Sequence, residues 1–94
     1  MSLFITRVEL HGATERDYTN LHVAMSREGF SHVIVADNSS RYILPTAEYN
    51  MVSYGTSSDV LAAAQRAANS TGISSSILVT ESTRTVWSNL PQAR

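Results

Sequence analysis

Hydrophobic and polar residues alternate along the first part of the chain, over residues 4–11. One face of this alternation carries Phe4, Thr6, Val8 and Leu10, and the other carries Ile5, Arg7, Glu9 and His11. A period of two is typical of a strand that buries one side and leaves the other in solvent. The sequence therefore predicts a half-buried strand over residues 4–11.

A helical period follows this strand, with apolar side chains at Tyr18, Leu21 and Met25. Thr14 and Asp17 stand three residues apart, as the two partners of a capping box do at the start of a helix. Gly29 is placed to end the helix, because glycine readily adopts the conformation that follows a last turn. We therefore predict an amphipathic helix between Thr14 and Gly29, with His22 as a partly buried packing residue.

The middle of the chain carries two extended segments around a turn. The β-branched run over residues 31–36 predicts a strand, and residues 37–40 are types that favour turns. Extended structure resumes at residues 41–44 and continues over residues 47–54. Pro45 interrupts this second strand, so we predict a bulge or a kink there.

The last third of the chain predicts a helix and a strand. The alanine-rich segment over residues 59–69 has a high helix propensity, with Ser57 or Ser58 as its cap and Gly72 as its end. Residues 73–80 then carry the β-branched residues of a final strand.

The order of the predicted elements, β, α, β, β, α, β, matches the ferredoxin-like split unit. We therefore predict an α+β fold, in which an antiparallel four-stranded sheet has both helices on one face. One domain accounts for residues 1–94, because no linker, repeat or low-complexity tract divides the chain. In the C-terminal tail, about residues 82–94, we expect Trp87 to pack on the domain and residues 91–94 to fray.

Charge and composition narrow the range of partners. The formal net charge of −1 gives no long-range attraction for a polyanion, so any contact with RNA has to be local. No apolar run approaches the length of a membrane span and no signal-peptide pattern is present, so we expect no membrane contact and a cytoplasmic location. With no cysteine and only 94 residues the chain builds a modest core, which favours a homodimer.

Three residues on the polar face of the first strand form the candidate catalytic site. His11 is a candidate general base for a 2′-hydroxyl, Arg7 a clamp for the scissile phosphate, and Glu9 a carboxylate that orients the reacting groups. The alternative interpretation is a polar strand that is solvated or lies between two copies of the chain. The sequence has no His-x-x-x-His pair, cysteine pair or phosphate-binding glycine loop, so we predict no metal site and no cofactor.

Arg41, Tyr49 and Asn50 are the candidate RNA-binding residues. On a sheet surface an aromatic ring stacks on a base, an amide reads a base edge and an arginine holds a phosphate. The alternative is that Tyr42, Tyr49 and Tyr54 are core and interface rings, because the basic-Gly-aromatic pattern of RNA-recognition modules is missing from the sequence.

Two runs of the sequence carry a resemblance to a known family. Residues 30–37, Phe-Ser-His-Val-Ile-Val-Ala-Asp, and residues 44–50, Leu-Pro-Thr-Ala-Glu-Tyr-Asn, resemble the GhoS family of bacterial antitoxins from type V toxin–antitoxin systems. The resemblance implies a fold related to the CRISPR-associated Cas2 nucleases and a hydrolase, an endoribonuclease that cleaves the messenger RNA of a small membrane toxin. Cas2-like proteins carry an aspartate suited to a metal at the end of the first strand, where this chain has His11 and Gly12.

Two other functions stay open at this point. The chain is alternatively a noncatalytic homodimeric interaction module that uses the helix-free face of its sheet as the interface. Binding of a small metabolite by the same face is a third interpretation, which no sequence feature beyond the versatility of the fold favours.

Overall fold

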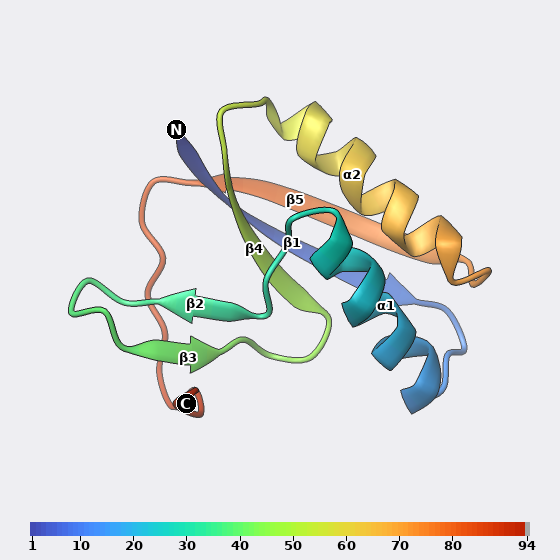
Figure 1. Ribbon diagram of the computed structural model, residues 1–94, viewed down its shortest axis with the longest axis horizontal. Helices are drawn as coiled ribbons and strands as arrows, with labels where there is room; N and C mark the ends of the chain where they lie inside the picture. The colour runs from blue at the N-terminus through green and yellow to red at the C-terminus, as the bar shows by residue number, and fades with distance from the viewer. Residues whose placement is uncertain (94) are drawn as a thin grey trace.

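The computed structural model describes residues 1–93, which form five strands and two helices (Figure 1). In chain order the elements are β1 (Ser2–Leu10), α1 (Glu15–Arg27), β2 (Val33–Val35), β3 (Arg41–Ile43), β4 (Glu48–Ser53), α2 (Ser57–Ser70) and β5 (Ser75–Ser82). The predicted α+β class is confirmed, since two helices accompany strands that pair antiparallel.

Strand β1 is the centre of a three-stranded antiparallel sheet with the order β4-β1-β5. Arg7 lies opposite Glu48 of β4 on one side and opposite Leu78 of β5 on the other. The alternation predicted for this strand is confirmed, because the side chains that it buries are Phe4, Thr6, Val8 and Leu10.

Both helices pack against each other and on the side of the sheet that carries these buried residues (Figure 1). Helix α1 begins at the predicted capping box, in which the Asp17 N–H donates to Thr14 Oγ1 over 3.3 Å and the Thr14 N–H donates to Asp17 Oδ2 over 2.9 Å. Helix α2 begins at a second capping box, formed by Thr56 and Asp59. The cap that we predicted at one of the two following serines is therefore wrong.

The core lies between the sheet and the two helices. Its largest fully buried side chains are Tyr49, Phe4, Leu21, Met25, Val8, Val60 and Thr6. Helix α2 contributes mostly small side chains to the core, at Ala63, Ala64, Ala67 and Ala68. Small side chains let the helix approach the sheet closely, so the bulk of the core comes from the strands and from α1.

The strand predicted over residues 41–54 is divided by a turn near Pro45. Ala47 adopts a positive φ of 71°, and the Glu48 N–H donates to the carbonyl of Pro45 over 3.0 Å, which closes the turn. A left-handed residue turns the chain out of the extended path, and a proline has no N–H for a strand ladder. The interruption predicted at Pro45 is confirmed, but it separates two strands of different sheets, β3 and β4, and does not kink a single strand.

Strands β2 and β3 form a separate two-stranded hairpin. The chain after β5 returns to this hairpin, where the Ile43 N–H donates to the Pro91 carbonyl and the Ala93 N–H donates to the Arg41 carbonyl, each over 2.8 Å. Residues 91–93 therefore pair with β3, and the prediction that they fray is wrong. Arg94, the last residue of that prediction, lies outside the described residues.

Trp87 lies in the returning segment and packs on the hairpin. Its ring centroid is 5.5 Å from that of Tyr42, and the two planes are tilted by 56°. The packing expected for Trp87 is confirmed, and its partner is a ring of β3. This contact joins the C-terminal segment to the hairpin in addition to the backbone hydrogen bonds.

The predicted single four-stranded sheet is not formed. The chain before β2 meets β4 at a bridge, in which the Ser31 N–H donates to the Asn50 carbonyl over 2.9 Å and the Asn50 N–H donates to the Ser31 carbonyl over 2.8 Å. Beyond this bridge, β2 turns away and pairs with β3. The order of elements is compatible with a ferredoxin-like split, with a bridge in the position of the fourth strand.

Candidate functional site

The face of the three-stranded sheet that lies away from the helices is called here the open face. It carries Leu3, Ile5, Arg7 and Glu9 of β1, with Val52, Asn50 and Glu48 opposite them on β4 and Ser82, Thr80, Leu78 and Ser76 opposite them on β5. Residues directly opposite each other in a sheet project from the same face, so these side chains form one surface. The open face is the surface on which the candidate catalytic residues were predicted.

The structure places Arg7, Glu9 and His11 together on the open face. Arg7 and Glu9 are exposed, and they alternate with the buried residues of β1. His11 follows the strand, and its N–H donates to the Ser74 carbonyl over 2.8 Å, so the pairing of β1 with β5 continues by one residue. The alternation correctly predicted that these three side chains share one face of the sheet. Their catalytic roles stay predictions.

Two serine hydroxyls, one from β5 and one from the residue before it, hold the His11 ring. The His11 Nε2 atom is 2.8 Å from Ser76 Oγ, and the His11 Nδ1 atom is 3.3 Å from Ser74 Oγ. A hydroxyl both donates and accepts, so this pair accommodates either neutral tautomer of the imidazole. Among residues 1–93 Glu9 has no hydrogen bond to His11, so the orienting groups on the ring are the two serines and not the carboxylate that we predicted.

Arg7 presents its guanidinium without a carboxylate partner. Within residues 1–93 the ion pair present joins Arg66 to Glu28, over 2.8 Å, and Arg7 takes part in none, although Glu48 lies opposite it in the register. Four residues of strand separate Arg7 from His11, which is about 13 Å along the backbone. An arginine side chain covers only part of this distance, so the spacing does not favour the predicted clamp on the scissile phosphate, and the role of Arg7 stays a prediction.

Tyr49 does not lie where an RNA base could stack on it. Its side chain is 1% exposed and faces the helices, where it packs edge-on against Phe30 with ring centroids 6.5 Å apart. The predicted base-stacking role is therefore wrong for this arrangement, and the alternative of a core ring is confirmed. The reason is register: Tyr49 pairs with Thr6, which is a buried position of β1.

Asn50 lies on the open face, but its amide is used within the fold. The Asn50 Nδ2 atom donates to the carbonyl of Val33 over 2.7 Å and to that of Ser31 over 3.1 Å. Both amide hydrogens are therefore committed to holding the start of β2 against β4. Arg41 is exposed on β3 and lies on the hairpin, apart from the three-stranded sheet. The three predicted RNA-binding residues thus do not form one surface.

Apolar side chains are also exposed on the open face. Val52, which lies opposite Leu3 at the end of β1 away from His11, is 55% exposed, and Leu78, which lies opposite Arg7, is 66% exposed. Neither is covered within residues 1–93. A groove of about 910 Å³ begins at Leu3 and Val52 and continues between β2 and the segment after β5, as far as Trp87. The open face therefore carries exposed apolar side chains both beside Arg7 and at the end next to the hairpin.

The described part of the chain offers no preformed metal site and no membrane span. Across residues 1–93 no three side chains of His, Cys, Asp or Glu lie close enough together to hold a metal ion. Neither α1 nor α2, the helices of residues 1–93, has the length and apolar character needed to cross a bilayer. Comparisons of the chain with protein-family models, with curated proteins and with solved structures find no match.

Proposed function

We propose that the chain is an endoribonuclease with a ferredoxin-like fold, which cleaves RNA at the His11 end of its open face. The observation that carries this proposal is an exposed histidine whose ring is held by two hydroxyls, on the same strand face as an arginine with no carboxylate partner. A positioned base and a cation are the groups that cleavage next to a 2′-hydroxyl needs. The resemblance to the GhoS family supports the same activity and gives the substrate class, the messenger RNA of a small membrane toxin.

The reaction follows from the chemistry of these groups. The 2′-hydroxyl replaces one of the two serine hydroxyls at the His11 ring, His11 takes its proton, and the resulting oxygen attacks the adjacent phosphorus. The bond from phosphorus to the 5′-oxygen of the next nucleotide breaks, that oxygen takes a proton from water, and the hydroxide formed takes the proton from His11. The products are a 2′,3′-cyclic phosphate and a 5′-hydroxyl, and Arg7 holds the neighbouring phosphate of the bound strand.

The proposal predicts cleavage that does not depend on a divalent cation. Purified protein is incubated with the messenger RNAs of small membrane-spanning proteins encoded beside its gene, with and without a chelator, and the fragments are separated on a denaturing gel. We expect the same fragments at the same rate in both reactions. Cleavage that stops on chelation would contradict the mechanism, and intact RNA in every reaction would contradict the activity.

The exposed apolar side chains of the open face favour a second candidate function, a homodimeric interaction module. Leu78 and Val52 are more than half exposed on a sheet face that no helix covers, and exposed apolar patches of this kind are typical of interfaces. Sedimentation equilibrium distinguishes the two functions. A strict monomer would remove the interaction module, whereas a dimer that loses its affinity in Leu78→Glu would support it.

A further inference from the structure

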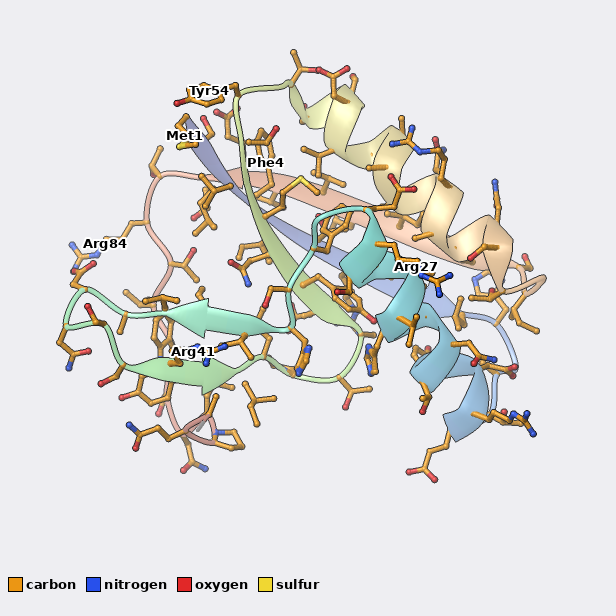
Figure 2. All side chains as sticks on the ribbon, in the orientation of Figure 1. Met1, Phe4, Arg27, Arg41, Tyr54 and Arg84 are labelled. Carbon is orange, nitrogen blue, oxygen red and sulfur yellow. The ribbon has the colours of Figure 1, made fainter. Side chains whose placement is uncertain are left out.

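A second concave site lies on the helix-bearing side of the molecule, between α1 and the β2–β3 hairpin. It has a volume of about 520 Å³ and is called here the basic pocket. Its lining includes His22 and Arg27 of α1, His32 of the segment before β2, and Arg41 of β3. Arg41 lies over the hairpin, and Arg27 extends from α1 on the side away from the hairpin (Figure 2).

The charge in this pocket has one sign. Four of its lining residues are arginine or histidine, and none of the lining residues within residues 1–93 is acidic. Neither Arg27 nor Arg41 takes part in an ion pair within the described residues, where Arg66 and Glu28 form the pair present. Cations gathered in a concavity without a counter-ion create a positive potential that attracts an anion.

The two histidines of the basic pocket lie close to each other. Their ring centroids are 6.0 Å apart. Burial, and after it the neighbouring His32, lower the pKa of His22 below its usual value of 6.5. The groups that face His22 are Tyr49 of β4, His32 before β2 and Arg41 of β3, and Arg27 is on its own helix. When both imidazole rings are charged they repel each other, and an anion bound between them would attract both.

The Tyr49 hydroxyl fixes the orientation of the His22 ring. Tyr49 Oη lies 2.5 Å from His22 Nδ1, and within residues 1–93 it has no other hydrogen-bond partner. Burial, and after it the neighbouring Tyr18, raise the pKa of Tyr49, so the hydroxyl keeps its proton. When this hydroxyl donates its hydrogen bond to Nδ1, the hydrogen of neutral His22 is on Nε2 and is a donor for a ligand.

We propose that the basic pocket binds a phosphate group, with Arg41 and the two histidines as its donors. Arginine presents a planar fork of donors that matches phosphate oxygens, and imidazole N–H groups complete the contacts. The site is separate from the open face, because His22 packs on Tyr49 from the helix side of the sheet. The inference therefore does not depend on RNA cleavage at His11.

The test is a histidine titration followed by NMR, in inorganic phosphate and in chloride at equal ionic strength. We expect phosphate to raise the pKa of His22, by about one unit, because an anion nearby favours the charged ring. Arg41→Gln is expected to remove this rise. Arg16→Gln, which deletes an arginine in the first turn of α1, is the matched control and is expected to leave the rise intact.

Two outcomes would overturn the inference: the same pKa for His22 in phosphate as in chloride, or the same rise in Arg41→Gln as in the wild type. Two further ligands then distinguish the source of the phosphate group. A nucleoside 5′-monophosphate carries a terminal phosphate, and a dinucleoside monophosphate carries only an internal phosphodiester. Tighter binding of the first assigns the pocket to a free or terminal phosphate, and tighter binding of the second assigns it to a nucleic-acid backbone.

The pH dependence of binding provides a second readout. A phosphodiester keeps one negative charge between pH 5.5 and 7.5, so any change in its affinity over this range comes from the protein. Because the charged rings bind an anion more strongly than the neutral ones, we expect the affinity to fall by about tenfold as pH rises from 5.5 to 7.5. A pH-independent affinity would show that charging of the histidines contributes nothing to binding, and it would contradict the proposal.

Discussion

Replacement of His11 by alanine is expected to lower the rate of RNA cleavage by about 10²- to 10⁴-fold, which is the usual contribution of a positioned general base. The loss should appear in kcat, because the imidazole acts on the 2′-hydroxyl during the reaction and contributes little to binding of the strand. His11 is exposed, and its ring contacts are hydrogen bonds to Ser74 and Ser76. The variant should therefore fold, and its thermal unfolding midpoint should match that of the wild type.

Arg7→Gln is the contrasting variant on the same strand face. The separation between Arg7 and His11 places the guanidinium on a neighbouring phosphate, so its loss should raise KM and change kcat little. Salt should also affect the variant less than the wild type, because one phosphate contact is missing. Unchanged cleavage in both His11→Ala and Arg7→Gln would contradict the assignment of the site to this face.

Phe4→Ala is expected to have the largest effect on stability, and to lower the free energy of unfolding by about 3–5 kcal/mol. Phe4 is 0% exposed and belongs to the core between the sheet and both helices. A domain of this size has a stability of roughly 5–14 kcal/mol, so the loss is a large share of the total. Urea unfolding followed by circular dichroism measures it, with Leu78→Ala on the open face as a control that should change stability by less than about 0.5 kcal/mol.

Thr6→Val is a substitution in the same core that we expect to raise the free energy of unfolding. Thr6 is 0% exposed, and its Oγ1 has no hydrogen-bond partner within residues 1–93. Valine has the same shape without the hydroxyl, so it removes the penalty of burying an unsatisfied polar atom, which is about 1–3 kcal/mol. We expect the variant to be more stable than the wild type, and a loss of stability would show that the hydroxyl has a partner in solution.

Local patterns in the sequence predicted the parts of the fold that neighbouring residues determine. The alternation of β1 and the Thr14 cap of α1 depend on residues within a few positions of each other, and both are confirmed. The cap of α2 was misplaced although the same pattern is present, because the serines after Thr56 also fit a cap. Where several serine or threonine residues precede a helix, the sequence pattern therefore does not show which of them is the N-cap.

Pairing between segments that are distant in the sequence determines the parts of the fold that the local patterns did not predict. A left-handed Ala47 sets where β4 begins, and the register of β4 on β1 then turns Tyr49 toward the core and Asn50 toward the open face. A shift of one residue would exchange the two, so no pattern within the segment decides which side chain is exposed. The Ser74 and Ser76 partners of His11 depend in the same way on the register of β5.

The residues of the basic pocket could not be grouped from the sequence either, because they come from segments that only the fold brings together. His22, His32 and Arg41 come from a helix, a connecting segment and a hairpin strand, and the sequence separates them by about ten residues at each step. His22 was predicted to be partly buried, which is confirmed, but the half-buried histidine gave no signal of the other cations around it. The register of the hairpin places Arg41 opposite Val35 and not opposite His32, so the Arg41 side chain reaches the pocket from the turn end of the hairpin.

The chemical ends of the cleaved RNA test the central claim most directly. The fragments that the wild-type protein produces are analysed by mass spectrometry, beside a control in which the same sequence is offered as DNA. A histidine that activates the 2′-hydroxyl leaves 2′,3′-cyclic phosphate and 5′-hydroxyl ends, and it leaves the DNA intact. Fragments with 3′-hydroxyl and 5′-phosphate ends, or cleavage of the DNA, would contradict it.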